Sequence, residues 1–312
     1  MQWDSHLGRR LKLRELYILL EVIQAKGIGR AAERLNMSQP AVSNAIADLE
    51  RAIGVRLLDR SRQGVEPTPY GSALIKRGVA VFDELRQGIQ DIEFLADPTA
   101  GELRIGSAEG MAAGPVLAVI NRISRRHPRI VFHIVTGDEE RLLHELIERN
   151  IELAVTRLTG LVTGKHLNAE ILFDEPLVVA AGSRNPWTRR RRIQLAELVN
   201  EPWTLFPPDT TGGAVLTDTF RAFGLEPPRA TVFTVSLNLR KALLATGRFL
   251  AVLPSAALTQ PGGSSLKALR VDLTNTRRPT GIITLKNRTL SPLAQLFIER
   301  MRAAAKPLAM GH

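Results

Sequence analysis

The sequence predicts an α/β protein that carries an all-α head at its N-terminus. Residues 26 to 62 contain two short helical patterns joined by a tight polar turn. From Glu102 onward, short apolar runs with strand character alternate with segments of helical periodicity, which is typical of an α/β domain. With 312 residues, the chain is long enough for two or three units that each bury a core.

The head begins with a helix over residues 11 to 25. We expect its apolar residues to pack beneath a later helix, and these are Leu13, Leu16, Tyr17, Leu20 and Ile23. The next helix is shorter, with Ala31, Ala32 and Leu35 on one stripe. Asn36-Met37-Ser38 then interrupts the helical period, so the chain turns there.

A third helix starts after this turn. Ser38 is suited to be its N-cap, and Pro40 falls in the first turn, where a missing N–H costs little. The residues expected to face inward recur at three- and four-residue steps, and these are Val42, Ile46, Leu49 and Ile53. The outer side is small and hydrogen-bonding, and it carries Gln39, Ser43, Asn44 and Ala47.

A polar outer face of this kind indicates a DNA-reading helix. Helix-turn-helix proteins place it in the major groove, where Gln and Asn pair bidentately with adenine and Ser bonds a phosphate or a base edge. A hairpin-like stretch over residues 57 to 69 follows, and Arg60 and Arg62 make it a candidate basic wing on the DNA backbone. The alternative is a pair of ordinary core helices, because the generic pattern has many false positives.

Thr68 and Pro69 predict the start of a long helix that runs to about Ala96. Along it an apolar stripe recurs at alternating four- and three-residue steps, formed by Leu74, Gly78, Val81, Leu85, Gly88, Ile92 and Leu95. Such a stripe favours pairing with the same helix of another chain. Packing of the helix on its own head is the alternative, and glycine at two of the seven positions weakens the coiled-coil interpretation.

The sequence that follows this long helix predicts strands and helices in alternation. The expected strands span residues 103 to 106, 130 to 136, 151 to 156, 176 to 181, 230 to 234, 249 to 253, 266 to 273 and 280 to 285. The expected helices span residues 113 to 125, 138 to 149, 212 to 223, 237 to 245 and 292 to 304.

The head closely resembles that of the LysR-type transcriptional regulators in the string AAERLNMSQPAVSNAIADLERAIGVRLLDR, followed by TPYG, and the resemblance extends more weakly over the whole chain. It implies base or groove contacts by Gln39, Pro40, Ser43 and Asn44, phosphate contacts by Ser38 and Arg34, and a wing served by Arg60 and Arg62. Most family members have Arg at the position of Asn44, so operator preferences do not carry over there.

The resemblance also implies an architecture. Residues 1 to 68 would form the winged helix-turn-helix domain, 69 to 97 a dimerising linker helix, and 98 to 312 a two-lobed, periplasmic-binding-protein-like (type II) effector domain. Lobe one would comprise residues 101 to 172 and 267 to 304, and lobe two residues 173 to 266. A homotetramer, built as a dimer of dimers, would bind and bend an interrupted palindrome in double-stranded DNA, with RNA polymerase as a further candidate partner.

Ligands of open α/β sheets bind at the carboxyl ends of the strands, beside helix N-termini. The residues expected there are Ser107, Glu109, Asp138, Arg157, Thr210, Thr211 and Ser236. For Ser107, Asp138, Thr211 and Ser236, plain helix capping is the simpler role of each taken singly. Many family members have Ser or Thr in place of Glu109 and Gly110.

A carboxylate at Glu109 disfavours an acidic effector unless Arg157 neutralises it, and it suits a polyol, sugar or amine. A Glu109 side chain that faces solvent would explain the sequence equally well.

The net charge of +11 and a pI near 10.7 suit a polyanionic partner such as nucleic acid. The excess is not concentrated in the head, because residues 1 to 70 carry eleven Lys/Arg and eight Asp/Glu, whereas residues 101 to 312 carry 28 and 18. Charge is therefore supporting information only. We expect the run from Arg189 to Arg192 to be a solvated loop.

The chain has no cysteine, which excludes disulfides, thiolate catalysis, zinc–thiolate sites and thiol redox sensing. Its six histidines form no HExxH pattern and no cluster, and GxSxG, Walker and GxGxxG motifs are absent. We therefore predict no metal, no cofactor and no enzyme activity. No apolar run approaches the ~20 residues of a membrane span, and the N-terminus lacks a signal-peptide core, so we expect a soluble cytoplasmic protein.

The leading hypothesis is a sequence-specific regulator of transcription in which an effector closes two lobes and thereby shifts an equilibrium between assemblies. One alternative is a sequence-tolerant architectural DNA-binding protein whose C-terminal lobes serve only assembly. Another is a small-molecule-binding protein or enzyme with an incidental helical head. Preference among DNA sequences at fixed salt separates the first two, and lack of DNA affinity would favour the third.

Overall fold

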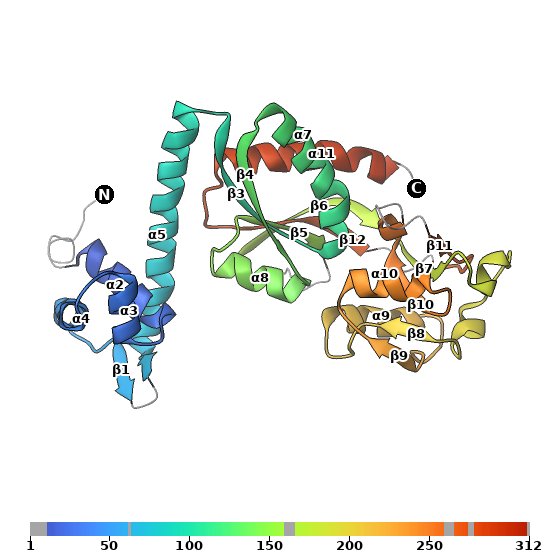
Figure 1. Ribbon diagram of the computed structural model, residues 1–312, viewed down its shortest axis with the longest axis horizontal. Coiled ribbons are helices and arrows are strands. Elements are labelled where there is room, and N and C mark those ends of the chain that lie inside the picture. The colour runs from blue at the N-terminus through green and yellow to red at the C-terminus, as the bar shows by residue number, and fades with distance from the viewer. Residues whose placement is uncertain (1–10, 62–63, 159–165, 259–264, 274–277, 311–312) are drawn as a thin grey trace. The chain divides into compact units, whose positions relative to one another are not determined.

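A computed structural model describes residues 11–61, 64–158, 166–258, 265–273 and 278–310 (Figure 1). The chain divides into two compact units, Met1–Gly88 and Ile89–His312. The elements confirm the predicted α/β protein with a helical head. No helix in the described part combines the length and the apolar character that crossing a bilayer requires.

Within its described residues, the first unit contains three short helices and a two-stranded hairpin. They are α2 (Leu13–Gln24), α3 (Ile28–Arg34), α4 (Gln39–Ile53), β1 (Leu58–Ser61) and β2 (Gly64–Pro67). The inward face predicted for α2 is partly wrong, because Leu13 and Tyr17 are exposed while Ile18 and Leu19 are buried. Apolar residues lie on most sides of this helix, so spacing alone did not determine which side packs against the other helices.

The turn between α3 and α4 is formed by local backbone chemistry. Asn36 adopts a φ of 52°, a left-handed conformation that Asn tolerates better than most residues. Ser38 is the N-cap of α4, and its hydroxyl accepts a hydrogen bond from the Ala41 N–H at 3.3 Å. Gly54 ends the helix with a φ of 85°. The predicted start of α4 is thus confirmed.

The hairpin is tied to both of its neighbouring helices. A carboxylate oxygen of Glu50 accepts hydrogen bonds from the N–H groups of Leu57, at 2.8 Å, and Leu58, at 3.3 Å. Thr68 donates its hydroxyl to the Arg56 carbonyl at 2.8 Å and accepts from the Gly71 N–H at 3.0 Å. Thr68 therefore caps the next helix, as the sequence predicted, while it also holds the segment that leads into β1.

That helix is α5 (Pro69–Ala96), with 28 residues. The predicted stripe along it divides into two parts. Leu74, Ile75 and Phe82 pack on the head core, and Gly78 lies against Leu16. Further along the helix Phe94 packs on the core of the second unit, but five other apolar side chains are exposed by 40 to 81 %, and these are Val81, Leu85, Ile89, Ile92 and Leu95. The alternative of packing on the head is therefore right for the first half of the stripe.

The described part of the second unit contains two five-stranded sheets. In the first the strand order is β4-β3-β5-β12-β6, and the strands are β3 (Ala100–Ser107), β4 (Arg129–Thr136), β5 (Leu153–Arg157), β6 (Leu167–Glu175) and β12 (Arg278–Leu285). Helices α7 (Leu117–Arg126) and α11 (Pro292–Met310) contribute to one core cluster of this sheet, and α8 (Glu139–Ile147) contributes to another. Before α7 lie α6 (Glu109–Met111) and a π-helical turn (Ala112–Val116) kinked at Gly114.

In the second sheet the strand order is β11-β7-β10-β8-β9. The strands are β7 (Leu177–Gly182), β8 (Trp203–Leu205), β9 (Ala230–Phe233), β10 (Leu250–Pro254) and β11 (Leu266–Ala268). Helix α9 (Thr211–Arg221) packs Leu216 and Phe220 in one core cluster with Trp203. Helix α10 (Leu237–Ala245) packs Leu237 and Leu244 in a second cluster.

The sheets define the two lobes and correct their predicted limits. Strand β6 was not expected, and it stays in the first sheet up to Glu175, beyond the predicted crossing near Leu172. The short β8 was also missed, and β11 ends at Ala268 rather than at Leu273. Leu269 and Leu273 pack in the lobe-two core without being strand residues, which explains why their periodicity resembled a strand.

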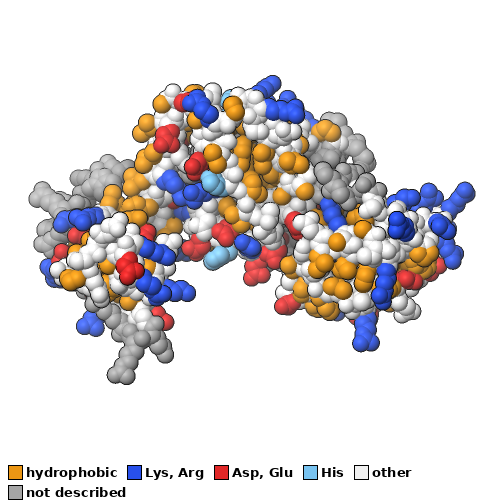
Figure 2. Space-filling view, viewed as in Figure 1, with side chains coloured by type: hydrophobic (Ala, Val, Ile, Leu, Met, Phe, Trp, Pro, Cys, Tyr) orange, Lys and Arg blue, Asp and Glu red, His pale blue; other side chains and the backbone are white. Residues whose placement is uncertain are grey.

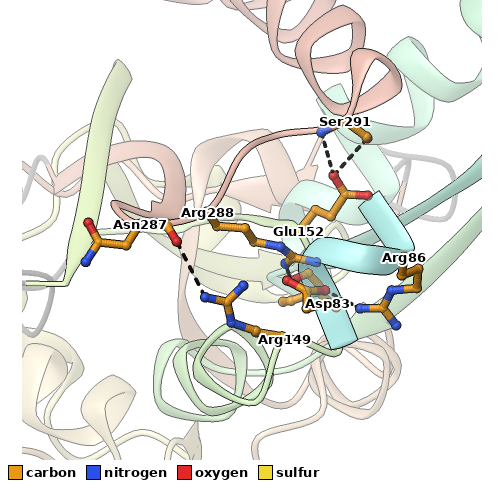
Figure 3. Close-up of polar contacts among 8 residues, drawn as sticks. Asp83, Arg86, Arg149, Glu152, Asn287, Arg288 and Ser291 are labelled. Atoms are coloured by element: carbon orange, nitrogen blue, oxygen red, sulfur yellow. Dashed lines mark hydrogen bonds and ion pairs between the residues drawn. The ribbon is translucent and has the colours of Figure 1, made fainter. Parts of the chain in front are cut away.

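Polar contacts anchor the return of the chain to lobe one (Figure 3). The buried Glu152 carboxylate accepts hydrogen bonds from the Ser291 N–H at 3.2 Å and the Ser291 hydroxyl at 2.8 Å. The same hydroxyl accepts from the Ala294 N–H at 3.2 Å, in the first turn of α11. Arg288 also donates to the Ile151 carbonyl. These contacts fix the start of α11 against the first sheet.

Candidate nucleic-acid interface and effector site

The N-terminal half of α4 presents hydrogen-bonding side chains to solvent. Gln39, Pro40 and Asn44 are exposed, and Ser43 is half-buried. On the opposite face the side chains are completely buried, and these are Val42, Ile46 and Leu49. The helix therefore has a fixed inner face and a polar outer face at the end that follows the turn, which is the geometry of a helix that enters a DNA groove.

Positively charged and capping residues flank this face. Arg34 is exposed in the last turn of α3, and Ser38 is exposed at the N-cap of α4. Arg60 belongs to β1, where its backbone is paired with Val65, but its side chain and all of Arg62 lie outside the described residues. Figure 2 shows Lys and Arg side chains on both units in the face that it presents, so positive charge is not confined to the head.

Three of the predicted effector residues act as helix caps. Asp138 accepts from the Arg141 N–H at 3.0 Å, Thr210 from the Gly213 N–H at 3.1 Å, and Ser236 from the Leu239 N–H at 3.2 Å. Thr211 is the first residue of α9, so the capping role considered for it belongs to Thr210. These helix N-termini follow strand ends, where capping and ligand contact are compatible.

Ser107 is the last residue of β3, completely buried, and its hydroxyl donates to the Ala108 carbonyl at 3.1 Å. It is not a helix cap, because Ala108 is the N-cap residue of α6 and makes no side-chain capping bond. Glu109 begins α6, and its carboxylate accepts a hydrogen bond from the Leu237 N–H at 2.7 Å. Because Leu237 belongs to lobe two, Glu109 does not simply face solvent.

Arg157 has a different partner from the one considered for it. Its guanidinium forms a 3.0 Å ion pair with Glu175, which is 2 % exposed at the end of β6. Burial raises the pKa of Glu175, and Arg157 opposes that rise. Neutralisation of Glu109 by Arg157, the condition under which an acidic effector would not be disfavoured, is therefore not what the structure shows.

Sequence reasoning missed three buried polar residues near these positions. Glu175, Thr280 and Arg240 are at most 2 % exposed, and each has a side-chain atom without a hydrogen-bond partner in the described part of the chain. Thr280 pairs with Arg157 across β12 and β5. Nothing in the local sequence marks these residues, because their burial results from strands and helices that are distant along the chain. Over the same part of the chain, no group of three potential ligand side chains could hold a metal ion.

Comparisons with known proteins agree with this arrangement. Residues 13–72 match the family model described as the bacterial regulatory helix-turn-helix protein, lysR family, and residues 96–306 match the LysR substrate binding domain. The chain is 30 % identical over 308 residues to the HTH-type transcriptional regulator GbpR of Azospirillum brasilense, covering 96 % of this chain and 88 % of that protein. It is 26 % identical to the transcriptional dual regulator GltC of Bacillus subtilis, with coverages of 93 % and 96 %.

Solved structures show the same fold. CbnR, a LysR family transcriptional regulator, matches with a TM-score of 0.66 at 20 % identity, covering 95 % of this chain and 99 % of that one. A full-length variant of OxyR from Pseudomonas aeruginosa matches with a TM-score of 0.67 at 22 % identity, covering 96 % of each chain. Full-length CbnR complexed with its target DNA matches with a TM-score of 0.55 at 21 % identity, covering 95 % and 100 %.

Proposed function

The chain belongs to the LysR family of transcriptional regulators, and from that premise we propose which of its residues read DNA and how it assembles. It is a DNA-binding regulator whose C-terminal domain binds an effector. Its curated relatives are regulators, and we assign the chain no catalytic step. A protein that acts on the chromosome works in the cytoplasm, which is where we place it.

Gln39, Pro40, Ser43 and Asn44 contact base edges or the groove wall in this proposal. The observation that supports these roles is the exposed polar row at the start of α4, on a helix whose other face is completely buried. Gln and Asn amides can pair bidentately with adenine, and the Ser43 hydroxyl can reach a phosphate or a base edge. Arg34 and Ser38 lie beside this row and contact phosphates, while Arg60 and Arg62 serve the wing.

Self-association completes the proposed assembly. The second half of α5 exposes a continuous apolar stripe over Val81, Leu85, Ile92 and Leu95, a pattern that suits a two-helix seam. A dimer built on this seam presents two reading helices, and two dimers form the tetramer. The operator is then an interrupted palindrome, because paired half-sites mirror the twofold symmetry of the protein.

The effector domain uses the loops at the strand ends of the two lobes. We assign effector contacts there to Ser107, Glu109, Asp138, Arg157, Thr210, Thr211 and Ser236. The region contains the carboxyl groups of Glu109 and Glu175 as well as the guanidinium of Arg157. These carboxyl groups favour a ligand with amine or hydroxyl groups over a simple carboxylate.

The DNA assignment is tested with the full-length protein and an operator selected from random double-stranded oligonucleotides. We expect Gln39→Ala to weaken binding to the selected operator by about 1 to 3 kcal/mol while binding to random DNA stays the same. Arg34→Ala, on the neighbouring helix, should weaken both by similar factors and lower the salt dependence by about one phosphate contact. The readout is fluorescence anisotropy at several salt concentrations.

Two results would contradict these roles. Equal losses for both variants on every DNA would show that Gln39 does not read bases. A wild-type protein that prefers its selected operator over random DNA by less than roughly a thousandfold would favour the architectural alternative.

A further inference from the structure

We propose that Glu109 is a resident anion: its carboxylate fills the anion site at the N-terminus of α10 and thereby bridges the two lobes without an acidic effector. The inference rests on the effector-domain role proposed above, and it specifies which group supplies the negative charge at that site. Small carboxylates would bind this site only after the Glu109 side chain is removed.

The first support is geometric. Glu109 follows β3 of lobe one, and Leu237 opens α10 of lobe two, so their 2.7 Å hydrogen bond joins segments separated by 128 residues. Gly110, the next residue, also lies close to lobe two, because a Cβ there would be 3.9 Å from a methyl group of Leu237. The half-buried carboxylate is therefore held at an approach between the lobes.

The second support is the incomplete capping of α10. The first N–H groups of a helix have no partner within it. Among the described residues, the hydroxyl of the N-cap Ser236 accepts from the Leu239 N–H, at 3.2 Å, and not from the Leu237 N–H. The Leu237 N–H must therefore be satisfied by another acceptor, and Glu109 provides one that also complements the positive end of the nine-residue helix.

The third support is a buried positive charge on the same helix. Arg240 is 1 % exposed, its guanidinium donates to the Val252 carbonyl at 2.6 Å, and its Nε has no partner within the described ranges. Burial lowers the pKa of Arg240 to about 10, and the negative charge of Glu109 opposes that fall. Burial also lowers the pKa of Lys241, and Glu109 opposes this shift too.

A buried guanidinium without an acidic counterpart would be costly. Arg157 is paired with Glu175 rather than with Glu109. Glu109 thus accepts a hydrogen bond at the N-terminus of α10, and its negative charge opposes the fall in the pKa of both Arg240 and Lys241. An acidic ligand entering this region of the wild-type protein would have to displace it.

The test is chemical rescue in the full-length protein. Glu109→Ala, Glu109→Gln and the wild type are melted in sodium acetate and in sodium chloride at equal ionic strength. Tryptophan fluorescence is the readout, because Trp187 and Trp203 both belong to lobe two and Trp203 is completely buried there. Glu148→Ala is the control, since it removes an exposed carboxylate from the same lobe as Glu109.

In chloride we expect Glu109→Ala to lower the melting temperature by about 2 to 4 °C. Acetate should restore most of that loss in Glu109→Ala and have no specific effect on the wild type or on Glu148→Ala, because mass action stabilises only a protein with a vacant anion site. Glu109→Gln should fall between the wild type and Glu109→Ala, because its amide oxygen accepts from Leu237 but carries no charge.

The inference is overturned if acetate acts equally on all four proteins, or if Glu109→Ala melts like the wild type. Operator binding by the wild type is measured in parallel. If the rescue is lost while operator binding is intact, only the role of Glu109 is refuted. If acetate rescues the variant but the wild type does not bind its operator, the proposed DNA-reading roles are refuted and the anion site is not.

Discussion

A single residue, Gly71, decides whether the hairpin and α5 can meet. A Cβ at this position would lie 2.0 Å from the Leu57 carbonyl oxygen, which is a backbone atom and has little freedom to move. Thr68 holds these two segments together at the same place, because its hydroxyl donates to the Arg56 carbonyl and accepts from the Gly71 N–H. The glycine of the TPYG segment is therefore explained by close packing rather than by an unusual φ.

We expect Gly71→Ala to destabilise the head by roughly 3 kcal/mol or more, because the clash forces the hairpin away from α5. Gly29→Ala is the matched control: Gly29 is helical, and its added Cβ would meet no atom within 4 Å. That substitution should be neutral or stabilising by up to about 1 kcal/mol. Denaturant unfolding followed by circular dichroism checks both, and similar losses for the two would refute the steric explanation.

The raised pKa of Glu175 predicts the direction in which the stability of the protein changes with pH. Burial raises the folded-state pKa of this carboxyl above its usual value near 4.5, so the folded protein binds its proton more tightly than the unfolded chain does. Ionisation of Glu175 therefore costs stability as the pH rises through that raised pKa, and protonation restores it as the pH falls.

The comparison variant is Glu175→Gln, which cannot titrate at this position. We expect the stability of the wild type relative to Glu175→Gln to increase as the pH is lowered from about 7 toward about 4.5. Equilibrium unfolding of both proteins across this range isolates the one group, because all other carboxyls are common to them. A difference that stays constant, or that changes in the opposite direction, would show that Arg157 outweighs the burial of Glu175.

At the scale of elements, α5 combines two packing roles in one helix. Its first half packs Leu74, Ile75 and Phe82 on the head core. Its second half exposes Ile92 by 68 % and Leu95 by 81 %. Exposed apolar side chains in a continuous row on one helix indicate an interaction surface rather than isolated surface residues.

Ile92→Glu should therefore shift the protein toward smaller assemblies, because a charge buried in a helix seam is costly. Ile171→Glu is a close control, since Ile171 is 63 % exposed but lies on β6 rather than on α5. Sedimentation equilibrium of the full-length variants gives the masses. The seam proposal fails if Ile92→Glu keeps the mass of the wild-type assembly. It also fails if Ile171→Glu dissociates and Ile92→Glu does not.

At the scale of the whole molecule, an effector site and a DNA-reading head lie on one chain. Coupling between them is a free energy, so it must act equally in both directions. An effector is identified by the rise that it causes in the melting temperature of the full-length protein. We expect its binding to change the affinity of the protein for the operator by a measurable factor. The operator should then change effector affinity by the same factor.

Isothermal titration of the effector, with and without the selected operator, measures that factor independently of anisotropy. Unequal factors would mean that a further equilibrium, such as self-association, differs between the two experiments. A ligand that binds tightly and changes neither affinity would not be an effector, because it does not distinguish the two states of the protein.

The sequence alone determined the features that depend on neighbouring residues. The start of α4 follows from the Ser38 cap, and the start of α5 follows from Thr68. The alternation of strands and helices likewise follows from local periodicity, which is why most elements of the two lobes were predicted. The resemblance in the head supplied the family, which the comparisons then confirmed.

Tertiary structure alone decided the features that depend on distant partners. Nothing within lobe one's sequence shows that Glu109 meets the N-terminus of α10, or that Arg157 pairs with Glu175 and not with Glu109. The inner face of α2 and the division of the α5 stripe were likewise set by what packs against those helices. Local propensity acts over a few residues, whereas burial and charge pairing depend on which segments the fold brings together.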